Sequence, residues 1–282
     1  MKNNYLEKYR QDNLRKAQMK MLYILKEVVA VCDRHKIPYW LDGGTLLGAA
    51  RHGGFIPWDD DVDISMRKED LERFLKIAPS ELPEDLMVQT LETDEGLHNR
   101  AYKVRDLNSF FVDGDDDNRA PYQKGMFVDI FPFVNYPSRF HRLTKRLTRS
   151  LAVMNFRLNA PHYYSLRSVG ELIYFGWKRS LYLLIWQFLQ LWCKKGDYMC
   201  SYPYYNWYGT IYRTADLFPL GEIDFEGCTF KAPGHPDEYL QSIYGDWRKL
   251  PPPEKRVVHS LFFVPNLIEP KELLPKSKSA DK

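Results

Sequence analysis

The sequence predicts an α+β protein, with a mixed β-sheet flanked by helices and a helical insertion. Three observations lead to this prediction: apolar residues at helical spacing near the N-terminus, short apolar and aromatic runs bounded by glycine and proline after them, and a long basic, aromatic segment in the second half. With 282 residues, 44% of them hydrophobic, and 40 basic against 37 acidic side chains, the chain can bury a large core. This composition excludes an intrinsically disordered protein.

The first 50 residues predict a helix, a strand, a glycine turn and a second helix. Apolar residues recur at helical spacing over 14–32, and Pro38 is expected to end this helix. The aromatic and apolar run 39–41 predicts a short strand that stops at the glycine turn. Thr45 is then expected to cap a helix over 45–51.

Later runs of the same kind predict the remaining strands and the elements between them. A helix around 71–78 is expected to close at Pro79, and an acidic loop is expected at 113–118. The strands are expected at 61–66, 101–105, 110–112 and 126–133, followed by a hairpin turn at 226–227 and a helix at 236–245.

The composition divides the chain into four segments. Between Arg139 and Lys195 there are eleven Lys and Arg side chains and one acidic residue, Glu171, among many aromatics. We expect a helical insertion here, because the apolar residues form long helical stretches. The expected segments are a first core part at 1–138, the insertion at 139–205, a second core part at 206–275 and a flexible tail at 276–282.

The sequence favours a cytoplasmic protein. Residues 1–13 are polar with charges of both signs, unlike a secretory signal. The longest apolar run, 181–193, is interrupted by Gln187 and Gln190 and is shorter than the roughly 20 residues that span a bilayer. The widely spaced cysteines are expected to be reduced thiols, at Cys32, Cys193, Cys200 and Cys228.

The most informative stretch is Trp58-Asp59-Asp60-Asp61-Val62-Asp63-Ile64. On a strand, alternation would place Asp59, Asp61 and Asp63 on one face. Carboxylates this close repel one another unless a cation neutralises them, and oxygen ligands suit Mg²⁺ or Mn²⁺. The stretch therefore predicts a metal site, with a solvated acidic turn as the alternative.

Asp129 is a single carboxylate in the otherwise apolar run 127–131. A buried carboxylate requires a partner. If its strand lies beside the strand of Asp61, Asp129 supplies a third carboxylate, either as a metal ligand or as the base that activates a hydroxyl. The alternative is a hydrogen bond to a backbone amide or an ion pair with Arg105.

The segment Gly43-Gly44-Thr45 follows a predicted strand and opens a helix, so its backbone amides can receive a phosphate oxygen. Neither the dinucleotide-binding fingerprint nor the P-loop is present, because the later glycines and the Gly-Lys-Ser/Thr ending are missing. His52 and His259 are interpreted as structural histidines or as residues that support a ligand without binding it, since no carboxylate or cysteine lies at ligand spacing around either.

Together these motifs closely resemble the LicD family, which includes phosphocholine transferases and fukutin-type enzymes. The resemblance covers most of the chain outside the insertion. It implies a nucleotidyltransferase-like fold related to polymerase β, and metal-dependent transfer from a CDP-activated donor to a sugar or alditol hydroxyl. The matching segments are 41–52, 54–63, 104–106, 127–132, 239–240, 244–247 and 251–252.

The resemblance implies a role for each matching residue. The expected catalytic residues are Asp61, Asp63 and Asp129, and the expected ligands of Mg²⁺ or Mn²⁺ are Asp59, Asp61, Asp63 and Asp129. Basic side chains near these carboxylates could hold phosphate, although a solvated strand edge is the alternative for Lys103 and Arg105. The donor phosphate is expected at Gly43, Gly44, Thr45, Arg51, Lys103 and Arg105.

The expected donor is CDP-choline or a CDP-alditol, and the expected acceptor is a glycan precursor such as a lipid-linked one; no nucleic acid is expected. A choline group would need an aromatic cage, for which Trp40, Trp58, Tyr122, Trp207 and Tyr244 are available without assignment. The basic insertion predicts peripheral contact with anionic lipid at the inner face of the cytoplasmic membrane. A helical subdomain with a solvated basic face is the alternative.

Two other functions compete with this transfer reaction. One is a nucleotidyltransferase that activates a phosphorylated small molecule with a nucleoside triphosphate. The other is an inactive binding subunit of a glycan-assembly complex, against which the intact Asp61, Asp63 and Asp129 argue.

Overall fold

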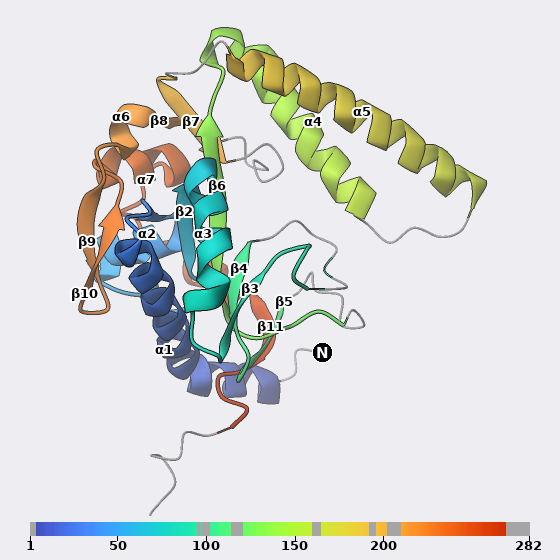
Figure 1. The fold of residues 1–282 in the computed structure, drawn as a ribbon. Coiled ribbons are helices and arrows are strands. Elements are labelled where there is room, and N and C mark those ends of the chain that lie inside the picture. The colour runs from blue at the N-terminus through green and yellow to red at the C-terminus, as the bar shows by residue number, and fades with distance from the viewer. Residues whose placement is uncertain are drawn as a thin grey trace, which may run out of the picture.

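The computed structural model confirms the α+β class: helices surround a mixed sheet, and a helical hairpin extends from one end of it (Figure 1). The structure describes residues 4–94, 97, 102–113, 121–159, 165–191, 196–201 and 210–268. Four sequence predictions lie outside these residues: the thiol Cys193, the aromatic Trp207, most of the acidic loop and the tail 276–282.

Among the described residues, the main sheet has seven strands in the order β1-β2-β6-β4-β3, with β7 and β8 joined at the far end of β6. The strands β2 and β6 run parallel, and the other neighbours are antiparallel. Their bounds are Trp40–Leu41 (β1), Asp63–Arg67 (β2), Leu86–Gln89 (β3), Lys103–Asp106 (β4), Phe127–Asn135 (β6), Tyr198–Ser201 (β7) and Tyr212–Arg213 (β8).

Two further strand pairs flank the sheet. The predicted hairpin is confirmed: β9 (Gly221–Phe225) and β10 (Cys228–Ala232) meet at a turn where Glu226 and Gly227 have φ angles of 54° and 73°. The other pair joins β5 (Phe110–Asp113) to β11 (Ser260–Val264). The sequence analysis missed β3, β7, β8 and β11, of which β7 lies within the segment expected to be a helical insertion.

The helices pack on the sheet as amphipathic elements. α1 and α3 lie side by side across one face of the sheet, and α2 packs against β2 and α7 (Figure 1). The helices in the described residues are α1 (Asn4–Arg34), α2 (Gly43–His52), α3 (Lys68–Glu81), α4 (His141–Asn159), α5 (Leu166–Leu191), α6 (Thr214–Leu217) and α7 (Pro236–Tyr244), with 3₁₀ turns at Ser138–Phe140 and Pro253–Lys255.

Two predicted helix ends are wrong. α1 begins ten residues earlier than expected, and it ends at Arg34, so Pro38 is not the residue that terminates it. α3 continues through Pro79 to Glu81, because the Leu82 amide donates to the Ala78 carbonyl and closes one more turn. A proline near a C-terminus removes one intrahelical hydrogen bond, which the remaining bonds of that turn can offset.

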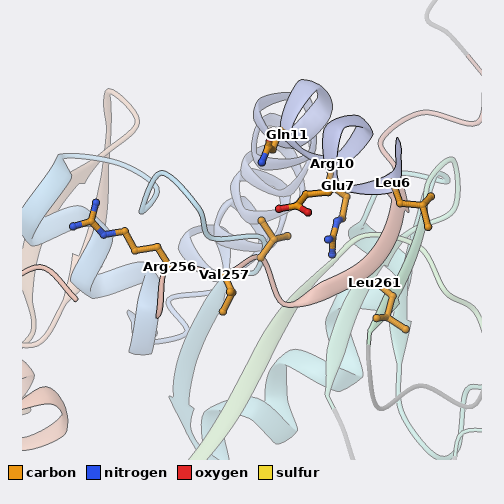
Figure 2. Close-up of a pocket in the computed structure, with 8 residues that line it drawn as sticks. Leu6, Glu7, Arg10, Gln11, Arg256, Val257 and Leu261 are labelled. Carbon is orange, nitrogen blue, oxygen red and sulfur yellow. The ribbon is translucent and has the colours of Figure 1, made fainter. Parts of the chain in front are cut away.

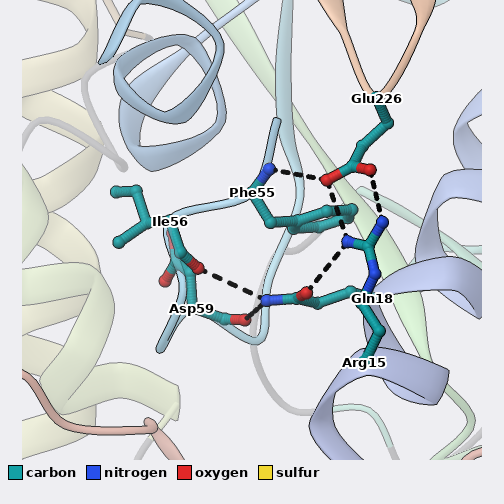
Figure 3. A network of polar contacts seen from close by, with 6 residues as sticks. All are labelled: Arg15, Gln18, Phe55, Ile56, Asp59 and Glu226. Atoms are coloured by element: carbon teal, nitrogen blue, oxygen red, sulfur yellow. Dashed lines mark hydrogen bonds and ion pairs between the residues drawn. The ribbon is translucent and has the colours of Figure 1, made fainter. Parts of the chain in front are cut away.

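An ion pair fastens the β9–β10 hairpin to α1 (Figure 3). The two terminal guanidinium nitrogens of Arg15 donate to the Glu226 carboxylate, at 2.5 and 2.9 Å, and the Phe55 amide donates to the same carboxylate at 3.0 Å. These hydrogen bonds hold the pKa of Glu226 below its usual range. The hairpin turn is thereby attached to the loop that follows α2.

Beside this ion pair, Gln18 holds the next part of the same loop (Figure 3). Its buried amide nitrogen donates to the carbonyl of Ile56 at 3.3 Å and to that of Asp59 at 2.9 Å. α1 therefore fixes the backbone at the beginning of the aspartate-rich stretch.

Glu226→Gln is expected to lower the free energy of unfolding at pH 7 by about 1 kcal/mol, because charge-assisted hydrogen bonds are lost at a partly exposed pair. The lowered pKa of Glu226 means that its contribution is present above the ordinary glutamate pKa and is lost as the pH falls through the folded value. The difference between wild type and variant should therefore shrink in acid, as measured by urea unfolding at pH 7 and at about pH 3.

Glu222→Gln is the matched control, because Glu222 pairs with Lys231 on the same hairpin but is 60% exposed. It should change the unfolding free energy by less than about 0.5 kcal/mol. Equal effects of the two substitutions would contradict a role for Glu226 in fastening the hairpin.

Candidate functional site

The parallel strand pair brings two predicted carboxylates together. Asp63 is the first residue of β2, and it lies in register with Asp129 of β6. Residues opposite each other on neighbouring strands project to the same side of a sheet. The expectation that the two strands are neighbours is confirmed, and the two carboxylates share one face.

The predicted position of Asp59 and Asp61 on that strand is wrong. β2 begins at Asp63, so these two aspartates belong to the loop before it. The apolar side chains Val62 and Ile64 are buried, as expected. The loop is anchored by Gln18 through the Asp59 carbonyl, which replaces strand pairing as the reason for its conformation.

The first turn of α2 lies directly against these carboxylates. A Cβ atom on Gly43 would lie 2.7 Å from Asp63 Oδ2, and one on Gly44 would lie 2.8 Å from Asp59 Oδ2 and 4.0 Å from Asp61 Oδ1. Gly43 also has a φ of +51°, which favours glycine. The glycine turn and the aspartates therefore form one site.

Asp42 is a site residue that the sequence analysis missed. Its carboxylate caps α2 by accepting from the Gly43 amide at 2.8 Å, and it also accepts from the hydroxyls of Tyr239 at 2.8 Å and Ser65 at 2.5 Å. Burial raises the pKa of Asp42 against the effect of these hydrogen bonds. An aspartate immediately before a helix is a known capping signal, which would have identified it.

Thr45 is therefore not the cap of α2, because Asp42 already holds that position. The Thr45 side chain is buried, and its hydroxyl accepts from the Asp63 amide at 2.8 Å. This hydrogen bond joins α2 to the first residue of β2. Its role is to position Asp63.

Asp60 anchors the loop to the C-terminal part of the chain. It is fully buried and accepts from the amides of His259 and Ser260, each at 2.9 Å. His259 Nδ1 consequently lies 3.8 Å from Asp61 Oδ2 and 3.8 Å from Asp60 Oδ1. The polar interaction with Asp61 raises the pKa of His259 to about 9, and the position of this histidine beside Asp61 agrees with a supporting role next to the site.

Negative charge accumulates in this site. Burial, together with the adjacent Asp61, raises the pKa of Asp59 to about 8. Burial and the charges of Asp61 and Asp129 raise the pKa of Asp63 well above its usual range. Lys103 Nζ binds Asp129 at 2.6 Å, so this lysine, and not Arg105, is the ion-pair partner of Asp129.

The residues present fit a hard divalent cation. Most of the potential ligand atoms in the site are carboxylate oxygens, and burial together with neighbouring carboxylates raises the pKa values of Asp59 and Asp63, as expected where negative charge lacks full compensation. Within the described residues, the ligand atoms that lie closest together, within 4.8 Å of one another, come from Asp59, Asp60 and His259. The four predicted ligands do not form a group that tight.

The predicted phosphate-binding cations lie in different surroundings. Arg105 is buried, and its guanidinium donates to Gln89 Oε1 and to the Gly125 carbonyl, both at 2.5 Å. Its guanidinium is thus held by Gln89 and Gly125, and not by Asp129. Lys103 lies at the site through its contact with Asp129.

A second cationic edge is formed by Arg51 and by Arg256, which the sequence analysis missed. Arg51 donates to the Trp247 carbonyl at 3.1 Å, and burial lowers its pKa, with the nearby Arg256 acting in the same direction. The Arg256 guanidinium lies 5.1 Å from the centre of the Trp58 ring. Arg51 therefore lies near Asp59, and Arg256 lies against the preceding residue, Trp58.

The structure reduces the number of aromatic side chains that could form a cage around a choline group. Trp40 and Tyr122 are buried, whereas Trp58 is half-buried and Tyr244 is 43% exposed. Burial and the charge of Asp63 raise the pKa of Tyr244, which places this phenol near the carboxylates. Of the cage candidates in the described part of the chain, Trp58 and Tyr244 border the site.

A cavity of about 350 Å³ lies between the first turns of α1 and residues 256–261 (Figure 2). Figure 2 shows the Arg256 side chain extending away from Glu7 and Arg10, which belong to α1. None of the predicted site residues lines this cavity. The lining residues are Leu6, Glu7, Arg10, Gln11, Arg256, Val257, Val258 and Leu261.

Comparison with known proteins gives matches that include this site. A family model described as LicD/FKTN/FKRP, nucleotidyltransferase domain, matches residues 36–157. The chain is 29% identical over 266 residues to the lipopolysaccharide cholinephosphotransferase LicD of Haemophilus influenzae, which is 88% of this chain and 96% of that protein. A 44-residue stretch is 57% identical to the ribitol 5-phosphate transferase FKRP of Homo sapiens, which is 16% of this chain and 9% of that protein.

The family match includes the glycine turn, the aspartate loop and Asp129, and the similarity to the Haemophilus transferase extends along most of the chain. Sequence motifs, site geometry and similarity thus agree: residues 36–157 match the LicD family model, and the chain is similar to a LicD transferase along most of its length.

Proposed function

We propose that this chain is a metal-dependent phosphotransferase of cell-surface glycan synthesis. It moves phosphocholine, or a similar phosphate-linked group, from a CDP-activated donor to a hydroxyl of a glycan precursor at the inner face of the cytoplasmic membrane, and it releases CMP. The observation that carries the proposal is the in-register pair Asp63 and Asp129 beside the glycine turn of α2. The named activities of the two transferase relatives support the reaction class.

Asp61, Asp63 and Asp129, with Asp59 beside them, would hold Mg²⁺ or Mn²⁺. When bound, the ion would neutralise charge on the donor phosphates. The first amides of α2 have no acceptor within the helix, so those of Gly44 and Thr45 can bind phosphate oxygens at the positive end of the helix. The Gly43 amide is already used by the Asp42 cap.

Cationic side chains provide the remaining contacts to the donor. Lys103 on one side and Arg51 on the other can bind its phosphate oxygens. Arg105 is left out of the proposed site, because its guanidinium is directed to Gln89 and Gly125.

In the transfer step, the acceptor oxygen attacks the phosphorus of the head group and forms a new P–O bond. The bond from that phosphorus to the bridging oxygen breaks, and CMP leaves with the electron pair. The proton of the acceptor hydroxyl passes to a carboxylate. Asp129, which Lys103 contacts at 2.6 Å, can serve there as a base or hold the ion.

Product analysis tests the proposal against its nearest alternative. With Mg²⁺ present, we expect CMP to be released from CDP-choline or CDP-ribitol in the presence of sugar or alditol acceptors. Release of pyrophosphate from CTP and a phosphorylated small molecule, with no CMP from either CDP compound, would establish a nucleotidyltransferase instead. Binding of the three nucleotides is measured alongside by calorimetry.

Asp63→Asn is expected to lower the rate of CMP release about a hundredfold or more, because a carboxylate that holds the ion is lost. Folding should be unaffected, since burial and neighbouring charges raise the pKa of Asp63 and a neutral amide relieves the repulsion. The measurements are CMP release and the thermal midpoint with and without Mg²⁺. Mg²⁺ should raise the midpoint of the wild type more than that of the variant.

Asp12→Asn, at an exposed position of α1, is the control and should behave as the wild type in both measurements. Asp61→Asn should resemble Asp63→Asn. Near-normal Mg²⁺-dependent turnover by either site variant would show that the metal site lies elsewhere.

Asp129→Asn is expected to reduce turnover by about a hundredfold while changing the melting temperature little. The Lys103–Asp129 pair is partly exposed, at 17% and 20% of the side chains, so water can solvate the lysine that is left behind. Lys103→Gln should mainly raise KM for the donor. An Asp129→Asn protein that melts much earlier but works normally below its melting point would indicate a purely structural ion pair.

A further inference from the structure

The helices α4 and α5 form a hairpin that projects from the end of β6 (Figure 1). It is attached through a small apolar cluster separate from the main core, to which Leu151 of α4 and Trp186 of α5 contribute. None of the residues assigned above to the transfer reaction belongs to this hairpin. It therefore has no part in the proposed chemistry.

The face of α5 opposite this cluster is apolar and exposed. Five exposed apolar residues of α5 follow one another at intervals of seven, four, seven and seven positions. This spacing places them on one side of the helix, opposite Trp186. At about 1.5 Å per residue, the stripe is nearly 40 Å long. It consists of Leu166, Ile173, Trp177, Leu184 and Leu191, which are 94%, 68%, 66%, 63% and 65% exposed. A continuous apolar surface of this size marks an interaction site.

The charge of the hairpin indicates what kind of partner binds this stripe. Residues 139–191 contain nine Lys and Arg and one acidic residue, Glu171. A second copy would bring an equally basic hairpin to the same face, and the like charges would repel. An anionic lipid surface complements both the charge and the apolar stripe.

Cations also lie around α5: Lys178 is on the flank of the stripe, and Arg157 of α4 is on the side of the apolar cluster, where Phe175 packs. Arg157 of α4 reaches across to the Phe175 ring, 5.2 Å from its centre, and Lys178 lies 5.4 Å from the Tyr174 ring. Long basic side chains at such positions can place their charges among lipid headgroups while their stems stay on apolar surface. Among the described residues, no helix is long and apolar enough to cross a bilayer.

We propose that the α4–α5 hairpin docks on an anionic membrane surface, with the stripe of α5 lying in the interface and the flanking cations contacting lipid phosphates. The proposal does not depend on which group the enzyme transfers. It concerns attachment, so it is tested separately from activity.

The first test is sedimentation of the full chain with phosphatidylcholine vesicles that contain or lack phosphatidylglycerol. We expect binding to the anionic vesicles only, and weaker binding as salt is raised. Trp177→Gln/Leu184→Gln should weaken binding roughly tenfold or more, because buried apolar area is lost. Leu250→Gln, at a 45% exposed position outside the hairpin, is the control and should bind as the wild type.

The second test reverses charge. Arg157→Glu/Lys178→Glu should weaken binding at least about tenfold, whereas Lys26→Glu/Lys249→Glu, which changes the net charge equally at exposed positions elsewhere, should have a much smaller effect. Circular dichroism verifies that each variant is folded, and CMP release with a soluble acceptor should be unchanged in all of them.

Three results would overturn the proposal: failure of the wild type to bind anionic vesicles at low salt, equal losses in the hairpin and control variants, or a dimer that Trp177→Gln/Leu184→Gln converts to a monomer. Light scattering on a sizing column detects the last, which would assign the stripe to a second copy of the chain. A loss of CMP release that leaves vesicle binding intact would affect the proposed reaction alone.

Discussion

Repulsion among carboxylates is the constraint to which the rest of this site responds. Parallel pairing of β2 and β6 sets Asp63 beside Asp129, and the preceding loop adds Asp59 and Asp61 to the same region. Such an arrangement is unfavourable for the folded chain alone, as the raised pKa values of Asp59 and Asp63 show. A protein maintains it only if many other contacts hold the backbone in place.

Those contacts come from all parts of the chain. α1 holds the aspartate loop through Gln18, and α2 has glycines at the two positions where a side chain would clash with a carboxylate. Asp60 accepts hydrogen bonds from two backbone amides at the start of β11. Lys103 supplies the partner of Asp129 from β4. The chain thus supplies rigidity and partial compensation, and the negative charge that remains is what the proposed cation would neutralise.

The sequence was sufficient for features that depend on local signals. The glycine turn, the hairpin at Glu226 and the helix from Pro236 each follow from a few adjacent residues, and the structure contains all three. The same reasoning could have identified Asp42 as the N-cap of α2, but Thr45 is also a favourable capping residue and was assigned that position. The strand assigned to Asp59 and Asp61 failed because alternating charge can also arise in a loop held by other elements.

Long-range pairings could not be predicted from one sequence. Nothing near Lys103 or Arg105 indicates that one meets Asp129 while the other turns toward Gln89, because this depends on the order of β4, β6 and β3 in the sheet. The same holds for the proximity of His259 to Asp61. These contacts are decided by topology, which composition and periodicity leave open.

The bond between Asp60 and Ser260 also has a consequence for biosynthesis. It joins residues 200 positions apart, so the aspartate loop cannot reach its final form while the chain is still short. A ribosome releases the N-terminal elements first, and α1 and the glycine turn can form early. The loop acquires its last anchors only when β11 emerges, so nascent chains contain the aspartates well before they contain a finished site.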